Sequence, residues 1–476
     1  MEKGALRISL ISPPSTLEDF FGKLSQTGSL QQPLGVAYIS SYLKRGGQSV
    51  QLVDAAALRL SIPRLISEVK SFHPDLIGIS AVTPSYLKTS KVAQKLKAEL
   101  GVPIIVGGPH VTSLPLETLS DPSFDYGVMG EGEITSLELL QTIESGKDLS
   151  DVKGIVYRDR QTKELRITPR REYIRNLDEL PFPDRESLPP LTEYHPSQSS
   201  YRRLPLGTLI SSRGCPHHCI FCDRAVFGNS YRARGAVNVV DEIELLVQKH
   251  RAREVRFWDD TFNLLPPRVI QICSEIRRRK LDIEWSCVAR VTNMTNEILY
   301  AMRQAGCWQV DYGVESGNPE ILKSIHKGMT MDWVRRGVRL SRENGLRVRA
   351  FFMLGLPGET EETMQQTINF AKNLDLDVAV FHIATPLPGT ELYKIARERG
   401  ELAEDVTWDK YLMFSAEELP YVTKTLTREV LREYSKRAYR EFYMRPRFIM
   451  GQVSRIRTKE DIQRYAKAFT TIRNLD

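Results

Sequence analysis

Short apolar runs alternate with amphipathic stretches through the first 145 residues. Five runs have the length of buried strands: 7–12, 49–54, 75–80, 103–108 and 124–129. The stretches between them, such as "GVAYISSYLKRGG" and "TSKVAQKLKAEL", repeat apolar residues at helical spacing. Continuous apolar strands connected by helices are typical of a parallel, doubly wound sheet. We therefore predict a Rossmann-like α/β domain over residues 1–145.

This alternation stops between residues 146 and 204. The segment "GIVYRDRQTKELRITP" has the pattern of a polar hairpin, and "LDELPFPDRESLPPL" is rich in proline. We interpret residues 146–204 as a hairpin followed by an extended linker.

A second alternation covers residues 205–395. Its six strand candidates are 207–212, 254–259, 283–288, 308–313, 348–354 and 378–383. Because six units fall short of a closed (β/α)8 barrel, we predict a partial (β/α)6 barrel with its reactive groups at the C-terminal ends of the strands. Residues 396–476 are predicted to form a mostly helical C-terminal region.

Composition narrows the class of protein. With 476 residues, 41% hydrophobic and 26% charged, the chain is an ordinary globular protein with more than one core. No apolar stretch approaches the roughly 18 residues of a membrane helix, and the apolar run in the first residues is too short for a signal peptide. Six scattered cysteines form no disulfide framework, which indicates a cytoplasmic protein. The net charge of +7 is mild, and without an RNA-binding motif or dense basic arm we expect no nucleic-acid partner.

The segment "SSRGCPHHCIFCDRAVFG" places three cysteines directly after the first barrel strand. Cys215, Cys219 and Cys222 have C-x3-C-x2-C spacing. Thiolates select zinc or iron–sulfur clusters, and structural zinc normally takes four protein ligands. Three ligands on a four-iron cube would instead leave one iron open for a substrate. A zinc site with His217 or His218 as the fourth ligand is the alternative.

This motif, with Phe221 before its last cysteine, resembles the signature of the radical S-adenosylmethionine (SAM) enzymes, whose six-unit partial barrel matches the strand count. The resemblance implies a [4Fe–4S] cluster held by the three cysteines as metal-binding and catalytic residues. Its open iron would bind SAM, which is cleaved to a 5′-deoxyadenosyl radical. The SAM-binding residues implied at the other strand ends are Phe221, Asp259, Asp260, Arg290, Glu315, Ser316 and Leu356, with Asp259 the first choice for the methionyl ammonium.

The first domain resembles the cobalamin-binding subgroup of that family, similar to the anaerobic magnesium-protoporphyrin cyclase type. The matching segments are "ISPP", "QQPLGVAYISSYL", "GGPHVT" and "GEGE". The implied cobalamin-binding residues are Pro13, Gly35, Asp54, Ala56, Ser80, Thr83, Gly107, Gly108, His110, Gly130, Glu131 and Gly132. A doubly wound module that has lost its cofactor is the alternative, because a fold alone does not establish a ligand.

One position departs from the wider cobalamin-domain pattern. Where many such domains supply a lower axial histidine after the second strand, this chain reads "DAAALR", with Ala56 at the histidine position. We expect the lower face of cobalt to lack a protein imidazole.

The resemblance implies an enzyme that acts on an unactivated carbon, using methylcobalamin and a 5′-deoxyadenosyl radical as a methyltransferase. The alternatives are a radical cyclase or C–C bond-forming enzyme, and a non-catalytic iron–sulfur redox or binding protein. Implied partners are a small-molecule or lipid substrate and an electron donor such as flavodoxin or ferredoxin. The basic, aromatic stretch from Arg428 to Lys467 would either contact a membrane surface peripherally or pack its aromatic residues on the barrel.

Overall fold

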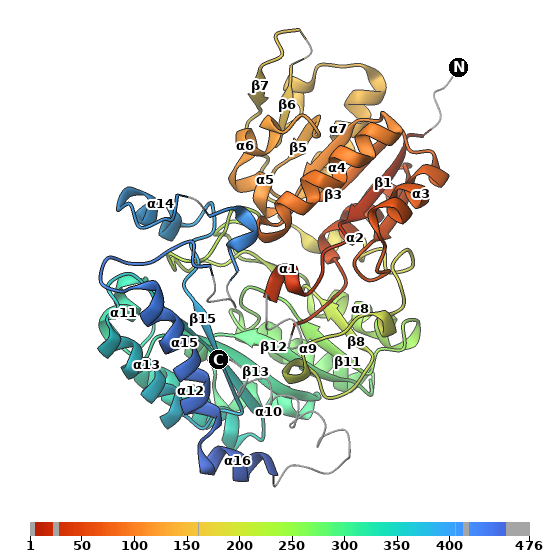
Figure 1. Cartoon of the computed structure of the whole chain (residues 1–476). Coiled ribbons are helices and arrows are strands. Elements are labelled where there is room, and N and C mark those ends of the chain that lie inside the picture. Colours follow the sequence, from red (N-terminus) through yellow and green to blue (C-terminus); the bar gives the residue numbers. More distant parts are fainter. Residues whose placement is uncertain (1–4, 22–27, 160, 405, 413–417, 454–476) are drawn as a thin grey trace.

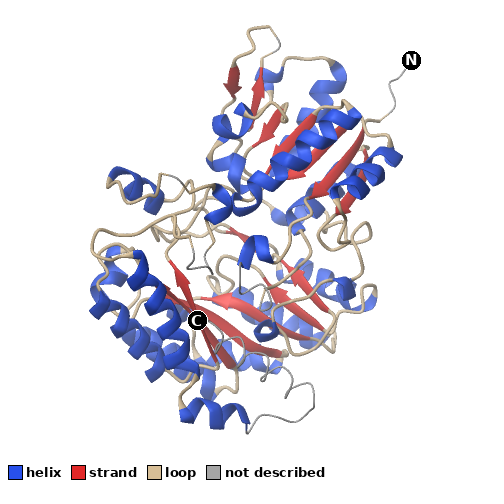
Figure 2. Cartoon of the chain, in the orientation of Figure 1, coloured by secondary structure: helices blue, strands red, loops and turns tan. Residues whose placement is uncertain are grey.

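A computed structural model describes residues 5–21, 28–159, 161–404, 406–412 and 418–453. Figure 1 shows two lobes, one formed by the first third of the chain and the other by the remainder. Each lobe is built around its own β-sheet, with helices packed against it (Figure 2). The α/β fold class predicted from the sequence is confirmed.

The first lobe contains a seven-stranded sheet in the order β2-β1-β3-β4-β5-β6-β7. The first five strands are parallel, as predicted, and β6 and β7 add an antiparallel edge. The predicted hairpin is therefore part of this sheet. The strands are β1 (Arg7–Ser12), β2 (Ser49–Asp54), β3 (Leu76–Ser80), β4 (Ile104–Gly107), β5 (Tyr126–Val128), β6 (Ile155–Arg158) and β7 (Leu165–Ile167).

Helices cover both faces of this sheet, which explains its continuous apolar strands (Figure 2). Ile77 and Val106 belong to one apolar cluster, and Leu10 and Tyr126 belong to another. The helices are α1 (Glu18–Phe21), α2 (Leu34–Arg45), α3 (Ile62–Phe72), α4 (Tyr86–Leu100), α5 (Pro109–Ser113), α6 (Pro115–Ser120) and α7 (Gly132–Ser145).

The second lobe contains six parallel strands in the order β15-β14-β13-β12-β11-β8, so β8 and β15 are its two edges. The predicted partial barrel is confirmed. The strands are β8 (Leu206–Leu209), β11 (Glu254–Phe257), β12 (Glu284–Ala289), β13 (Cys307–Glu315), β14 (Arg347–Leu354) and β15 (Val378–Ile383). The helices are α8 (Ala236–Gln248), α9 (Pro266–Arg278), α10 (Asn296–Gln304), α11 (Pro319–Ser324), α12 (Met331–Glu343), α13 (Glu361–Asn373) and α14 (Glu391–Glu398).

The linker covers the amino ends of the barrel strands. Glu254, the first residue of β11, accepts hydrogen bonds from the backbone N–H groups of Arg202 and Arg203 at 2.7 and 2.8 Å. Farther along the strands, Arg349 donates to Ser200 Oγ at 2.9 Å and pairs with buried Asp311. In barrels of this kind the amino end serves stability and the carboxyl end carries the chemistry.

The C-terminal region is helical, as predicted, and its helices are α15 (Arg428–Tyr443) and α16 (Pro446–Val453). The aromatic residues of α15 pack on the barrel, which was one of the two predicted alternatives, the other being a peripheral membrane contact. Residues 454–476, which belong to the basic stretch, lie outside the described residues. Across the described ranges, no helix is both long enough and apolar enough to cross a membrane.

Two tyrosines of α15 bond to the backbone of the edge strand β15. The Tyr439 hydroxyl accepts from Phe381 N–H and donates to Phe381 C=O, at 3.3 and 3.2 Å. The Tyr443 hydroxyl makes the same pair of bonds with Ala379, at 3.2 and 2.8 Å. Edge strands expose unpaired backbone groups, and these hydroxyls satisfy them.

Replacing both tyrosines, in Tyr439→Phe/Tyr443→Phe, should lower the free energy of unfolding by about 2–4 kcal/mol, because buried backbone groups lose their partners. Urea unfolding measures this difference. Tyr300→Phe, at a position 60% exposed on α10, is the matched control and should change stability by less than about 0.5 kcal/mol. Equal stability of the double variant and the control would contradict the assigned role.

Candidate active site

The three predicted metal-binding cysteines lie on one loop at the carboxyl end of the barrel. This cysteine loop, residues 214–231, connects β9 (Ser212–Arg213) to β10 (Arg232–Ala233), and the two short strands pair antiparallel. Gly214 has φ +82°, and a Cβ there would lie 2.3 Å from the Ser230 carbonyl oxygen. Only glycine fits this turn, so the loop closes tightly on itself.

The thiols of the cysteine loop are all free. Cys219 is buried, Cys215 is half-buried with its Sγ 3.6 Å from Thr261 Oγ1, and Cys222 is exposed. Among the described residues, no three His, Cys, Asp or Glu side chains converge on a single metal position. Thiolates are soft ligands that select zinc or iron–sulfur clusters, and three thiols on one loop fit an iron–sulfur cluster by their chemistry.

Cationic side chains surround the thiols. A hydrogen bond from Cys222, together with the charges of Lys327 and Arg290, lowers the pKa of Cys219 to about 6. Lys327 Nζ lies 5.5 Å from the centre of the Phe221 ring and pairs with Glu315 at 2.7 Å, with both side chains buried. The thiolate is therefore favoured at Cys219, whereas the hydrogen bond to Cys219 and burial raise the pKa of Cys222.

Glu315 and Arg290 hold the loop that carries Lys327. Glu315, the last residue of β13, has φ +71°, which a non-glycine residue adopts only where its surroundings impose it. Arg290 donates to the Lys327 carbonyl at 2.6 Å, and its backbone N–H donates to Asn263 Oδ1 at 2.9 Å. The structure thus brings these two predicted SAM-binding residues to the same place.

Asp259 and Asp260 follow β11 but have different surroundings. Asp259 is buried and accepts three hydrogen bonds, from the Ser211 N–H and hydroxyl at 2.6 and 2.5 Å and from the Ser212 hydroxyl at 2.7 Å. Asp260 is exposed and accepts one bond, from Gly214 N–H at 3.1 Å. Asp259 fixes the entrance of the cysteine loop, and Asp260 retains capacity for a ligand.

The carboxyl edge of the first sheet is open at two of the predicted glycines. A Cβ at Gly35 or Gly107 would meet no other atom within 4 Å, so packing within the protein does not require glycine there. The absence of side chains leaves room for a bulky ligand at this edge, and Ser80 and Pro13 lie at the ends of the neighbouring strands β3 and β1. This edge fits a large cofactor.

At other predicted positions on this edge, contacts within the protein account for the residue. Gly108, at φ +110°, would place a Cβ 2.6 Å from the Ala81 carbonyl oxygen. Gly130, at φ +74°, makes the turn after β5, and a Cβ at Gly132 would lie 2.7 Å from Ile39. Glycine at these three positions is explained by the fold itself. Glu131, between Gly130 and Gly132, forms ion pairs with Arg213 and Arg232.

His110 and Asp54 are buried. The His110 ring stacks on Tyr86 at 4.1 Å, its Nδ1 is 3.2 Å from Thr83 Oγ1, and burial lowers its pKa to about 4. Asp54 accepts a hydrogen bond from the Tyr194 hydroxyl at 2.9 Å. Ala56 lies in the turn after β2, two residues beyond Asp54.

Family comparisons match both lobes. Residues 209–371 match the radical SAM superfamily, and residues 24–140 match the B12 binding domain. The chain is 34% identical to the uncharacterized methyltransferase PH0819 of Pyrococcus horikoshii, over 94% of this chain and 95% of the relative. It is 30% identical to the anaerobic magnesium-protoporphyrin IX monomethyl ester cyclase of Rubrivivax gelatinosus, over 88% of this chain and 74% of the relative.

This chain belongs to the radical SAM superfamily. It also carries a B12-binding domain, so the resemblance inferred from the sequence is confirmed.

Solved structures share the fold of this radical SAM protein. The enzyme OxsB, with aqua-cobalamin and S-adenosylmethionine bound, matches with a TM-score of 0.75 at 18% identity, over 98% of this chain and 71% of that chain. The methyltransferase TsrM of Kitasatospora setae, with cobalamin and a [4Fe–4S] cluster bound, matches with a TM-score of 0.72 at 19% identity, over 91% of each chain.

The end of β14 carries the last predicted SAM contacts of this radical SAM protein. Glu359 Oε2 accepts from the backbone N–H groups of Gly355 and Leu356, at 2.6 and 2.9 Å, and fixes the turn. Burial raises the pKa of Glu359 to about 8. Ser316, after β13, contacts Thr367 Oγ1 at 3.1 Å. The assignment of Leu356 and Ser316 to SAM stays a prediction.

Sequence reasoning missed several residues that contact the predicted site residues of the two lobes. Lys327 was missed because no local pattern shows that it meets Glu315 across a helix. Arg213, two residues before Cys215, offered only a weak signal. Tyr194 and Trp408 lie outside the two α/β segments, and Trp408 reaches the His110 ring at 5.5 Å.

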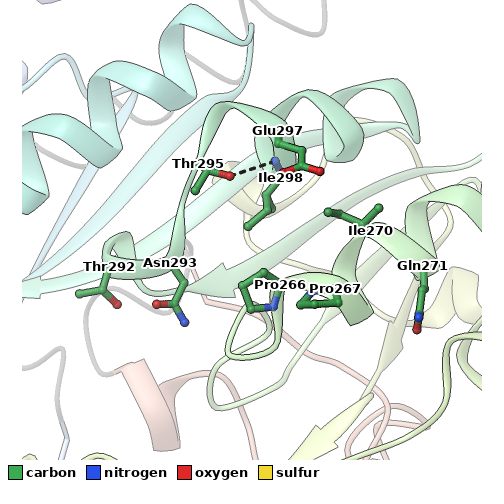
Figure 3. A pocket seen from close by; sticks show the side chains of 9 residues that line it. All are labelled: Pro266, Pro267, Ile270, Gln271, Thr292, Asn293, Thr295, Glu297 and Ile298. Atoms are coloured by element: carbon green, nitrogen blue, oxygen red, sulfur yellow. Dashed lines mark hydrogen bonds between the residues drawn. The ribbon is translucent and has the colours of Figure 1, made fainter.

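A surface cavity of about 720 Å³ lies between the starts of α9 and α10 (Figure 3). Pro266, Pro267, Thr292 and Asn293 are among its lining residues, and none of the predicted site residues belongs to the lining. It lies next to the strand ends, because Asn293 donates to the Asn263 carbonyl and the backbone N–H of Arg290 donates to Asn263 Oδ1.

The Glu359 carboxyl should make stability depend on pH. Because its folded pKa lies above the ordinary value near 4.5, its contribution is complete below that value and is lost as pH rises through about 8. Between pH 6 and pH 8 the wild-type protein should lose about 2 kcal/mol relative to Glu359→Gln, which does not titrate. Urea unfolding of both proteins at each pH measures this. Parallel pH profiles would contradict the assignment.

Proposed function

We propose that this protein is a cobalamin-dependent radical SAM methyltransferase that acts on an unactivated carbon of a small molecule. The proposal is carried by the position of the cysteine loop, which places three thiols at the carboxyl edge of the barrel. Arg213, just before this loop, pairs with Glu131 at the carboxyl edge of the B12-binding sheet, where Gly35 and Gly107 leave open space. The names of PH0819 and TsrM as methyltransferases support the reaction type.

The residues of the site have separate tasks in this proposal. Cys215, Cys219 and Cys222 would hold a [4Fe–4S] cluster with one iron open, and the charge of Lys327 helps to lower the pKa of Cys219. When bound, the cluster and cobalamin supply one-electron reduction of SAM and a transferable methyl group.

Polar groups at the strand ends would orient SAM. Asp260 has a free carboxylate oxygen for the methionyl ammonium, whereas the oxygens of Asp259 already accept three hydrogen bonds. This favours Asp260 over Asp259. Arg290 is placed beside the Lys327 loop, where a guanidinium would attract the carboxylate of SAM.

The second candidate is a radical cyclase that transfers no methyl group, favoured by 30% identity to the magnesium-protoporphyrin cyclase. Formation of S-adenosylhomocysteine separates the two, because only methyl transfer from SAM produces it. A non-catalytic iron–sulfur protein would form neither this product nor 5′-deoxyadenosine.

We also infer the setting of the reaction. The free cysteines agree with a reducing cytoplasm, and a flavodoxin or ferredoxin would supply the electrons. The packing of α15 on β15 favours a structural cap over a membrane contact for the described part of the C-terminal region.

Anaerobic reconstitution tests the proposal. We expect about four iron and four sulfide ions per chain, one corrinoid, and both 5′-deoxyadenosine and S-adenosylhomocysteine under reducing conditions. Cys219→Ala should lose the cluster and lower 5′-deoxyadenosine at least 100-fold. Cys273→Ala, which alters a buried cysteine of α9, is the matched control and should retain both. A wild-type protein that forms no 5′-deoxyadenosine would overturn the proposal.

The lower face of cobalt gives an independent test. With Ala56 in place of histidine, the electron paramagnetic resonance spectrum of the cob(II)alamin form should be identical for unlabelled and uniformly 15N-labelled protein. Ala56→His is the control in which a protein nitrogen should appear. A spectrum that changes on labelling the wild-type protein would show a protein nitrogen on cobalt and contradict the expectation.

A further inference from the structure

Four charged side chains form a buried ion cluster between the two lobes. We define this interlobe ion cluster as Glu131, Glu133, Arg213 and Arg232. Each of these side chains is at most 7% exposed. Its two carboxylates come from the start of the α7 segment, in the lobe with the B12-binding sheet, and its two arginines come from β9 and β10 of the barrel lobe.

Most of the hydrogen-bonding capacity of the cluster is used internally. Arg213 donates to Glu131 Oε1 at 2.8 Å and to Glu133 Oε1 at 2.6 Å. Arg232 donates to both oxygens of Glu131, at 2.9 and 2.8 Å, and to the Ile174 carbonyl at 2.7 Å. Ile174 N–H donates to Glu131 Oε2 at 2.8 Å. The Glu131 carboxylate therefore has little capacity left for an external ligand.

Aromatic faces enclose the cations. The Arg213 guanidinium lies 5.2 Å from the ring centres of both Tyr38, on α2, and Phe227, on the cysteine loop. Arg232 lies 4.9 Å from the Tyr173 ring centre and donates to the Phe227 carbonyl at 2.9 Å. Although burial alone would lower it, Glu133 and Glu131 raise the pKa of Arg213. The positive charge of Arg213 is therefore retained although its side chain is buried.

The position of the cluster gives it a purpose. Arg213 and Arg232 are directly opposite each other in the β9–β10 ladder, at the base of the cysteine loop, and Cys215 is two residues beyond Arg213. Glu131 follows β5 at the carboxyl edge of the first sheet, where ligands of such sheets bind. The cluster therefore joins the two edges to which the cofactors are assigned.

We propose that Glu131 and Glu133 are positioning residues that hold the base of the cysteine loop against the B12-binding edge and so set the separation of the two cofactors. That Glu131 and Glu133 hold the cysteine loop follows from the geometry alone. That they set the separation of the two cofactors rests on the proposed function. The glutamates of the "GEGE" segment, one of which the sequence assigned to cobalamin, act on the cysteine loop.

Hydrogen exchange of the cofactor-free chain tests the grip directly. In Glu131→Gln, amides of residues 212–233 should exchange at least tenfold faster than in the wild-type protein, with exchange in α4 and α13 unchanged. Glu133→Gln, which leaves Glu131 with both arginines, should give a smaller increase. Arg213→Lys should give an exchange rate between those of the wild-type protein and Glu131→Gln. Glu138→Gln is the matched control, because Glu138 lies on the same helix and pairs with Arg171 at 41% exposure.

A distance measurement in the reconstituted protein tests the consequence. Pulsed electron paramagnetic resonance between cob(II)alamin and the reduced cluster should give one narrow distance distribution in the wild-type protein and in Glu138→Gln. It should broaden in Glu131→Gln and, to a lesser degree, in Glu133→Gln.

The outcomes separate this proposal from the proposed function. Faster exchange confined to 212–233, with a broadened distance, supports it. Unchanged exchange and distance in Glu131→Gln overturn it, as does faster exchange spread over both lobes in Glu133→Gln, which would indicate a stability effect alone. If no cluster or cobalamin binds to the wild-type protein, the proposed function fails, and the exchange experiment still decides whether the glutamates hold the loop.

Discussion

The carboxyl ends of parallel strands lie at one edge of their sheet, and in this chain buried ion pairs join the carboxyl edges of the two sheets. Everything that the sequence marks as reactive follows from that constraint. The cysteine loop leaves the barrel beyond β8, and the open positions Gly35 and Gly107 lie in the first lobe. The contact of Arg213 with Glu131 and Glu133 brings one edge to the other without a mobile connection. The two carboxyl edges are thereby held at a fixed separation.

The elements that were predictable from the sequence are those whose cause is local. Strand runs such as 7–12 and 378–383 are visible because burial on both faces demands continuous apolar residues. The cysteine spacing is visible because Cys215, Cys219 and Cys222 are close together in the sequence. Pairings between distant segments leave no such trace. In the hairpin of β6 and β7 only β7 is an exposed edge strand, and β6 is buried beside β5. The polar residues of β7 and of the turn concealed the membership of this hairpin in the first sheet.

The roles of the acidic residues show the same limit. Asp259 and Asp260 are adjacent in sequence, and only their surroundings distinguish a carboxylate bonded to Ser211 and Ser212 from one with free capacity. Glu131 likewise lies in a segment that resembles a cobalamin motif, and its two arginine partners are 82 and 101 residues away in the sequence. Chemistry at strand ends can be located from sequence, but its division among neighbouring side chains depends on packing.

The linker is hydrogen-bonded to both lobes, which limits how the lobes can move to admit a large molecule. Arg185, almost fully buried, bonds to Gln32 in the first lobe, and to the Thr208 carbonyl at 2.6 Å and Glu242 at 2.7 Å in the second. Tyr194 anchors the same segment to Asp54, and Ser200 anchors it to Arg349 inside the barrel. A segment tied at three points behaves as a brace rather than a hinge. Moving the two lobes apart would break the bonds of this segment to Gln32 and Asp54, or else its bonds to Thr208, Glu242 and Arg349. Admission of a substrate through individual surface loops would leave both sets of bonds in place.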